Sequence, residues 1–144
     1  MDAEWAKLVP EFDVTDLKKS LDFYVGKLGF IVKYGREEDN FVYLDKEGSQ
    51  IMLEQIDTKD SHWLTGDLEK PFGRGINFQI EIADAVSLYN NLKRENFQMF
   101  DEREEKWYRV SEDLLVGQTQ FLVQDPDGYL LRFCSNLGVK PIEG

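Results

Sequence analysis

The apolar residues between positions 17 and 28 recur at spacings of three and four, which is the period of a helix with one buried face. The stripe consists of Leu17, Leu21, Tyr24, Val25 and Leu28. Thr15 or Asp16 offers a side-chain oxygen to the free amides at the start of this segment, and Gly29 is placed to end it. The pattern therefore predicts a helix over residues 17–28.

Short stretches with the apolar pattern of β-strands surround this helix. They cover residues 7–14, 30–35, 41–44 and 49–55, and turn-forming residues occupy 37–40 and 45–48. After a loop over residues 56–74 the same order returns, with a strand at 76–82 and a helix at 85–95 that Asp84 caps. Strands near 98–106, 119–123 and 129–134 complete the second half. The chain is therefore predicted to contain a βαβββ unit twice.

This repeat predicts an α+β fold with one domain over residues 1–144. Module 1 spans about 7–55, the loop covers 56–74, and module 2 spans about 75–137. The second half is longer than the first, which places an insertion around residues 108–117, where Ser111, Glu112 and Asp113 interrupt the strand pattern. Because each antiparallel sheet is too small to be stable alone, the two tandem modules are expected to share one core.

Charge and composition narrow the possible partners. Seventeen basic and 28 acidic residues give a net charge of −11, which opposes nucleic acids and anionic membranes. No apolar run approaches the roughly 20 residues that cross a bilayer, and the N-terminal residues lack the order of a signal peptide. Cys134 is the only cysteine, so an internal disulfide is excluded. We expect a soluble cytoplasmic protein with neither nucleic-acid nor membrane partners.

The sequence shows no apparatus for nucleophilic catalysis. His62 is the only histidine, so any Ser-His-Asp or Cys-His arrangement would have to use it. It lies in the expected loop with no second ligand at a recognisable spacing, which favours a surface histidine. Cys134 falls in an apolar strand, where a buried thiol is expected to be inert.

Four motifs resemble the glyoxalase, bleomycin-resistance and dioxygenase superfamily, also called the vicinal-oxygen-chelate superfamily. They are residues 16–24 with Leu28-Gly29-Phe30, residues 71–79, residues 105–109 and residues 120–133. Together they are most similar to the bleomycin-resistance branch and cover about residues 7–137. The resemblance implies curled mixed sheets around a concave face, and a homodimer in which two chains complete two equivalent pockets.

The resemblance also locates the positions at which enzymes of the superfamily bind a divalent metal ion. They fall at Val9, Met52, Asn77 and Arg132. Val9 and Met52 offer no hard donor, Asn77 is a weak neutral ligand, and the Arg132 guanidinium repels a cation. The expectation is therefore a protein without a metal, a cofactor or catalytic residues.

A bleomycin-type antibiotic carries a flat bithiazole and a cationic tail, so its receptor needs aromatic rings for stacking and carboxylates for the charge. The candidate ligand-binding residues are Trp107, Phe41, Tyr108, Trp63, Phe72, Glu38, Asp39, Asp60 and Glu104. For Trp63 and Phe72, pocket lining and core are equally compatible with the sequence. The leading hypothesis is sequestration of such a drug without chemical change. The alternatives are a metal-dependent lyase, isomerase or dioxygenase, or a binder of another flat cationic molecule.

Overall fold

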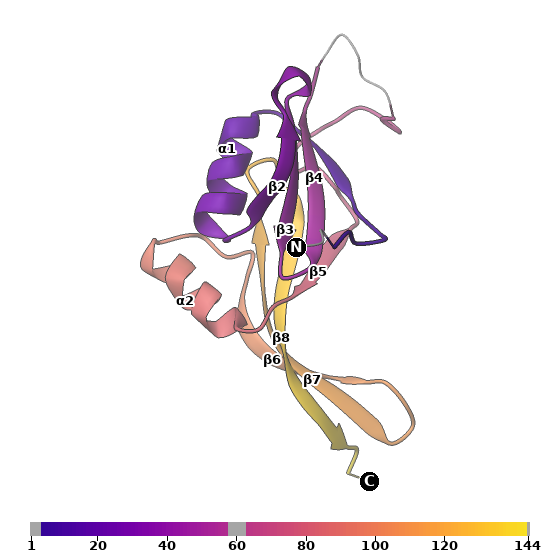
Figure 1. The fold of residues 1–144 in the computed structure, drawn as a ribbon. Helices are drawn as coiled ribbons and strands as arrows, with labels where there is room; N and C mark the ends of the chain where they lie inside the picture. Colours follow the sequence, from indigo (N-terminus) through magenta and orange to yellow (C-terminus); the bar gives the residue numbers. More distant parts are fainter. Residues whose placement is uncertain (1–3, 58–62, 144) are drawn as a thin grey trace. The chain divides into compact units, whose positions relative to one another are not determined.

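Each half of the chain folds as a strand, a helix and three further strands, as the repeat predicts (Figure 1). The structure is a computed structural model that describes residues 4–57 and 63–143. The chain divides into two units. Unit 1 contains the described residues up to Arg74 together with Asp125–Tyr129, and unit 2 contains Gly75–Gln124 and the residues from Leu130 onward.

Unit 1 contains a four-stranded mixed sheet and a short helical segment. Its elements are β1 (Glu11–Val14), α1 (Leu17–Leu21), the π-helical turn η1 (Asp22–Lys27), β2 (Ile31–Arg36), the 3₁₀ turn η2 (Glu37–Asp39), β3 (Phe41–Lys46) and β4 (Ser49–Gln55). The strand order is β1-β4-β3-β2, in which β1 and β4 are parallel and the other pairs antiparallel. Strand β1 is shorter than predicted and starts after Pro10, which lacks an N–H for a sheet hydrogen bond.

The first helix changes its hydrogen-bond pattern half-way along the predicted range. The Asp16 side chain accepts a hydrogen bond from the Lys19 amide at 3.3 Å, so Asp16 is the cap. The α-helical bonds end at Leu21, and the Leu28 amide instead donates to the Phe23 carbonyl at 3.0 Å, five residues back. Gly29 then adopts a φ of 81°, which ends the helical segment at the predicted place.

Unit 2 repeats this arrangement with longer strands. Its elements are β5 (Asn77–Glu81), α2 (Ala85–Arg94), β6 (Asp101–Arg109), β7 (Leu114–Gln124) and β8 (Leu130–Pro141), in the sheet order β5-β8-β7-β6. Asp84 caps α2 by accepting a hydrogen bond from the Ser87 amide at 3.0 Å. No helix of the described residues is long and apolar enough to cross a membrane.

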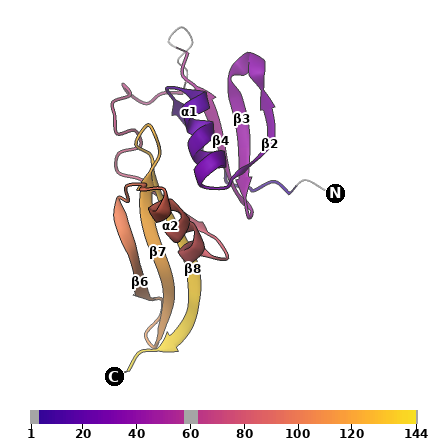
Figure 2. The same cartoon turned by 90° about the vertical axis from the view of Figure 1, so that its left-hand side faces the viewer.

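Each helix covers one face of its own sheet (Figure 2). In unit 1 the covered face carries buried side chains such as Val14, Leu44 and Leu53. In unit 2 it carries Phe121 and Phe133, and Tyr89 of α2 contacts Phe121 edge-on at 5.4 Å. Because side chains alternate along a strand, the residues between these positions point to the opposite face, here called the open face of each sheet.

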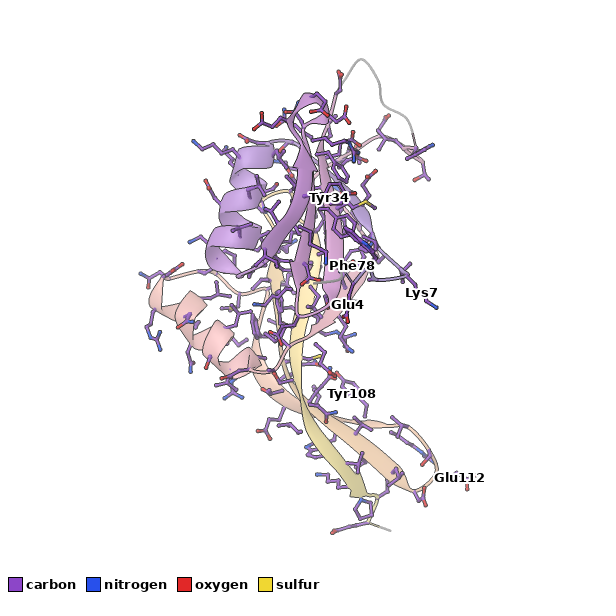
Figure 3. The ribbon with its side chains drawn as sticks, in the orientation of Figure 1. Glu4, Lys7, Tyr34, Phe78, Tyr108 and Glu112 are labelled. Carbon is purple, nitrogen blue, oxygen red and sulfur yellow. The ribbon has the colours of Figure 1, made fainter. Side chains whose placement is uncertain are left out.

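The region of the expected insertion, residues 108–117, forms the end of a long hairpin. Ser111, Glu112 and Asp113 are exposed and interrupt the strands, as predicted, while β6 continues to Arg109 and β7 begins at Leu114. Strand β8 follows β7 to its end, with Pro141 opposite Leu114. We call residues 106–117 with 137–141 the arm, and Glu112 lies at its tip (Figure 3).

The turn between β7 and β8 belongs to unit 1 and is built from two buried carboxylates. Asp125 Oδ1 accepts hydrogen bonds from the amides of Asp127, Gly128 and Tyr129 at 2.9 to 3.0 Å. Asp125 Oδ2 accepts from the Tyr24 hydroxyl at 2.8 Å. Asp127 accepts from the Thr15 amide and hydroxyl at 3.0 and 2.6 Å. The Asp-Pro-Asp-Gly motif is therefore a tight turn that packs against β1 and α1.

Replacement of Asp125 by Asn should change the pH dependence of folding stability. Burial raises the pKa of Asp125 to about 6 against the hydrogen bonds that favour its charge. The folded chain then binds more protons than the unfolded chain between about pH 4 and 6. The contribution of Asp125 to folding stability therefore falls by roughly 3 kcal/mol as the pH rises through this range. Urea unfolding of the parent and Asp125→Asn at pH 4, 5, 6 and 7 measures the difference. A difference that stays constant over this range would contradict the prediction.

Candidate functional site

Three aromatic rings lie side by side on the open face of unit 1. Tyr34 on β2 and Tyr43 on β3 are paired in register, and their ring centroids are 5.2 Å apart at an interplanar angle of 18°. Phe41 lies next to them, with its centroid 5.8 Å from that of Tyr34. We call Tyr34 and Tyr43 the aromatic shelf. In Figure 3, Tyr34 is on the side of its sheet that faces away from α1.

The N-terminal segment Glu4–Ala6 crosses this shelf. The Trp5 ring contacts both tyrosines edge-on, at centroid distances of 5.1 Å to Tyr43 and 5.9 Å to Tyr34. The side chain of Gln50, which is 5% exposed, accepts a hydrogen bond from the Ala6 amide at 2.8 Å and donates one to the Glu4 carbonyl at 2.7 Å. Burial raises the pKa of the Tyr43 hydroxyl, which donates to the same Gln50 side chain at 2.5 Å.

The open face of unit 2 is polar. The Gln118 amide nitrogen donates hydrogen bonds to the side-chain oxygens of Gln79 at 3.2 Å and Gln120 at 2.7 Å. The Tyr108 hydroxyl donates to the same Gln120 oxygen at 3.0 Å. Strand register places Arg132 on this face, opposite Gln79 of β5. Arg132 therefore shares this face with a row of amides and one hydroxyl.

Arg132 is a half-buried cation whose Nε lacks a hydrogen-bond partner among the described residues. A buried donor without an acceptor costs about 1–3 kcal/mol, which a ligand oxygen can recover. Cys134 is the next residue of β8 on this face and is 1% exposed. Burial raises the pKa of its thiol, with a further upward contribution from Glu81, so the thiol stays protonated at neutral pH.

A hollow of about 390 Å³ lies within the loop before β5, in unit 1. Trp63 and Phe72 both line it, together with Asp67, Glu69 and Arg74. Trp63 is 86% exposed and has a φ of 64°, whereas Phe72 is 5% exposed and packs edge-on against Tyr129. Of the two residues that the sequence left undecided, Phe72 therefore belongs to the core and Trp63 to the surface.

Trp107 and Tyr108 are neighbours on β6 and point to opposite faces of the arm. The Trp107 ring covers Gly117 on the adjacent strand, so closely that a β-carbon added to this glycine would come within 2.6 Å of the ring. Lys140 of β8 places its Nζ 4.0 Å from the centroid of the Trp107 ring. Trp107 is thus half-buried and in contact with its own chain.

Phe41 does not offer an open ring. It is 3% exposed, and the Arg36 guanidinium carbon lies 4.1 Å from its ring centroid. This candidate ring packs under an arginine that the adjacent strand supplies. On the same face, the ring of Tyr34 is 39% exposed.

The predicted acidic residues lie in different elements of the two units. Asp39 forms an ion pair with Arg36 at 2.7 Å, and Glu38 is exposed in the same turn of unit 1. Glu104 lies on β6 of unit 2, with Lys106 Nζ 3.9 Å away. Asp60 lies outside the described residues. Among the described candidates, Phe41, Glu38, Asp39, Trp63 and Phe72 belong to unit 1, whereas Glu104, Trp107 and Tyr108 lie on β6 of unit 2.

A family model described as the Glyoxalase/Bleomycin resistance protein/Dioxygenase superfamily matches residues 11–133. The chain belongs to this superfamily. A superfamily member from Vibrio splendidus 12B01 is 36% identical over 88% of this chain and 95% of its own, with a TM-score of 0.41. TioX from Micromonospora sp. ML1 is 18% identical over 92% and 100% of the two chains, with a TM-score of 0.69. A comparison with curated proteins gave no match.

A protein from Alicyclobacillus acidocaldarius with the superfamily's name has a TM-score of 0.60 at 20% identity, over 90% of each chain. At this identity the likeness concerns the fold: two four-stranded mixed sheets in tandem βαβββ modules. Superfamily membership includes both enzymes and proteins that only bind. The choice between them depends on the side chains of this chain.

The donor set of this chain does not fit the superfamily's metal site. At the four expected positions, Val9 and Met52 supply no oxygen or nitrogen from their side chains, and Arg132 supplies a cation. Among the residues that the structure describes, no group of three histidine, cysteine or acidic side chains could hold a metal ion. We therefore derive no chemical step through a metal.

Sequence reasoning missed Trp5, Tyr34 and Gln50 as parts of a possible site. Tyr43 alternates with the core residues Val42 and Leu44, and Tyr34 is its partner on the neighbouring strand, which could have placed both on the uncovered face. No sequence signal pairs Trp5 with them, because the contact depends on the path of the chain before β1. Gln50 could be recognised only after its partners were known.

Replacement of Gly117 by Ala should destabilise the protein. The new methyl group needs the space that the Trp107 ring occupies, so the ring must move, at a cost of about 1–3 kcal/mol. The matched control is Gly26→Ala, because a β-carbon at Gly26 meets nothing within 4 Å and that residue lies in a helical turn. Thermal unfolding should show a lower midpoint for Gly117→Ala and an equal or higher one for Gly26→Ala. Equal midpoints for Gly117→Ala and the parent would contradict the packing of Trp107 on Gly117.

Proposed function

We propose that this chain binds and sequesters a bleomycin-type cationic glycopeptide antibiotic without altering it chemically. The observation that carries the proposal is Arg132. It stands where enzymes of the superfamily have a metal-binding carboxylate, and its Nε lacks a partner on a face lined by amides. Such a face suits the carbonyl oxygens of a peptide-derived ligand and opposes a divalent cation.

Two further features support this ligand class. The net charge of −11 attracts a cationic drug and increases its rate of encounter. Aromatic side chains that remain at least 39% exposed are available to a flat ring, and they include Tyr34, Tyr108 and Trp63. Stacking and shape would supply most of the affinity, because exposed carboxylates contribute little once water and salt screen them.

We further propose that the chain acts as a homodimer. On the arm, Val110, Leu114 and Val139 are 59%, 40% and 66% exposed, which is unusual for apolar side chains next to one another on paired strands. A second copy of the chain would cover them. A contact through residues 8–12 is a separate route to the same assembly, since Leu8 is 88% exposed.

Titration with metal-free and copper-loaded bleomycin tests the binding proposal. The three tryptophans should report a saturable change in fluorescence, and the drug should be recovered unchanged by mass spectrometry. Tyr108→Ala should weaken binding by about 1–3 kcal/mol, roughly 5- to 150-fold in Kd, because the ligand loses an aromatic plate on the face that carries Arg132. The thermal midpoint of Tyr108→Ala should change little, since the side chain is 40% exposed.

Three outcomes would contradict this function. The first is no saturable binding of either drug form, and the second is conversion of the drug. The third is a parent protein that turns over a glyoxalase or dioxygenase substrate when zinc, nickel, manganese or iron is added. A Tyr108→Ala variant that binds the drug as tightly as the parent would remove Tyr108 from the site without affecting the general proposal.

Sedimentation equilibrium at micromolar concentration tests the dimer. The parent should have twice the 16.8 kDa mass of one chain. Val139→Lys should shift the mass toward one chain, because a charge at the centre of the arm must be desolvated for the copies to meet. Val86→Lys is the matched control, since Val86 is 36% exposed on α2 and away from the arm. A parent that sediments as a single chain would refute the dimer.

A further inference from the structure

The contact between Trp5 and the aromatic shelf resembles that of a ligand more than that of a core residue. The indole ring meets Tyr43 and Tyr34 edge-on, at interplanar angles of 85° and 75°. Yet Trp5 is 54% exposed, whereas Tyr43 beneath it is 6% exposed. A ring that leaves about half of its surface in water gives up less hydrophobic free energy on moving away than a fully buried ring does.

Water can also replace the polar contacts that hold Glu4–Ala6 on the shelf. Gln50 bonds the backbone of Glu4 and Ala6, and Lys33 Nζ donates to the Glu4 carbonyl at 3.0 Å. Lys33 Nζ also lies 4.8 Å from the centroid of the Trp5 ring. The backbone groups at this edge can exchange these bonds for bonds to water at a small net cost. The segment Glu4–Ala6 therefore lies on the shelf without being buried there.

The shelf keeps its form without Trp5. Tyr34 and Tyr43 are a cross-strand pair of the β2–β3 ladder, and their rings stack on each other. The Tyr43 hydroxyl is fixed by Gln50, which also donates to Asp45 at 2.9 Å. Removal of Trp5 would thus uncover a preformed aromatic surface of the size of a flat ring, which is a suitable binding site for a heteroaromatic group.

We propose that the aromatic shelf binds the flat ring of a ligand and that Trp5 is a built-in occupant which must leave first. The inference rests on the proposed function only for the identity of the natural ligand. Glu4–Ala6 then acts as a strap that competes with the ligand within the same molecule. A flat ring binds only to molecules in which the strap is open, so the apparent affinity is proportional to the open fraction.

Thioflavin T, a flat cationic benzothiazole dye that fluoresces when held rigidly, tests the strap independently of bleomycin. Titration should give a Kd for Trp5→Ala that is about 10-fold lower than for the parent, as expected if the strap is closed in about nine of ten molecules. Trp5→Phe is the matched control, because it keeps a ring on the shelf and should remain close to the parent. All variants carry the same net charge, so general attraction of the dye to an acidic protein cancels.

A second variant shows where the dye binds. In the Trp5→Ala background, replacement of the half-exposed Tyr34 by Ala should abolish the gain, since the shelf has lost one of its rings. Circular dichroism checks that each variant is folded. Equal dye affinity for the parent and Trp5→Ala would overturn the inference, and so would a gain that survives the loss of Tyr34. Failure of bleomycin to bind to the parent and to Trp5→Ala, with the dye result as expected, would overturn the proposed function and leave the strap intact.

Discussion

In the part of the chain that the structure describes, each four-stranded sheet has a single helical segment to cover it, and this constraint determines most of what the molecule exposes. A sheet has two faces, so α1 and α2 each leave one face without a helical partner. An uncovered face must be polar, or be covered by other residues, or bind something else. The two units meet this requirement differently. Unit 2 uses a row of amides and a tyrosine hydroxyl, whereas unit 1 uses aromatic rings beneath the N-terminal segment.

In the turn between β7 and β8, hydrogen bonds compensate for the burial of two carboxylates. Asp125 accepts three backbone amides and one hydroxyl, and Asp127 accepts an amide and a hydroxyl from Thr15. In the same turn, the Tyr129 ring stacks on Phe12 with the ring centroids 4.2 Å apart. Hydrogen bonds that favour the charged carboxylate and burial that opposes it therefore act at one site, and burial dominates for Asp125.

The open faces relate the fold to the proposed function through chemistry that differs between the units. The aromatic shelf offers π surfaces, while Arg132 and its amide neighbours offer hydrogen-bond donors. A flat ring suits the surface of unit 1, and carbonyl oxygens suit the surface of unit 2. The superfamily fold alone would not choose such a ligand, since the same fold serves unrelated chemistries.

The sequence by itself determined the repeat, the succession of strands and helix along each module, the helix caps at Asp16 and Asp84 and the superfamily. These features depend on local patterns: spacing of apolar residues, capping oxygens and turn-forming motifs. Once the resemblance to the superfamily supplied the metal-ligand positions, residue identity was enough to show that their side chains are unsuitable. Only the tertiary structure decided that the helix becomes π-helical at Asp22, that Phe41 and Phe72 are buried, that Trp107 covers Gly117, and that Trp5 lies on Tyr34 and Tyr43. Those outcomes depend on which side chains meet across strands and segments, and periodicity along one strand carries no information about the residue that arrives from another.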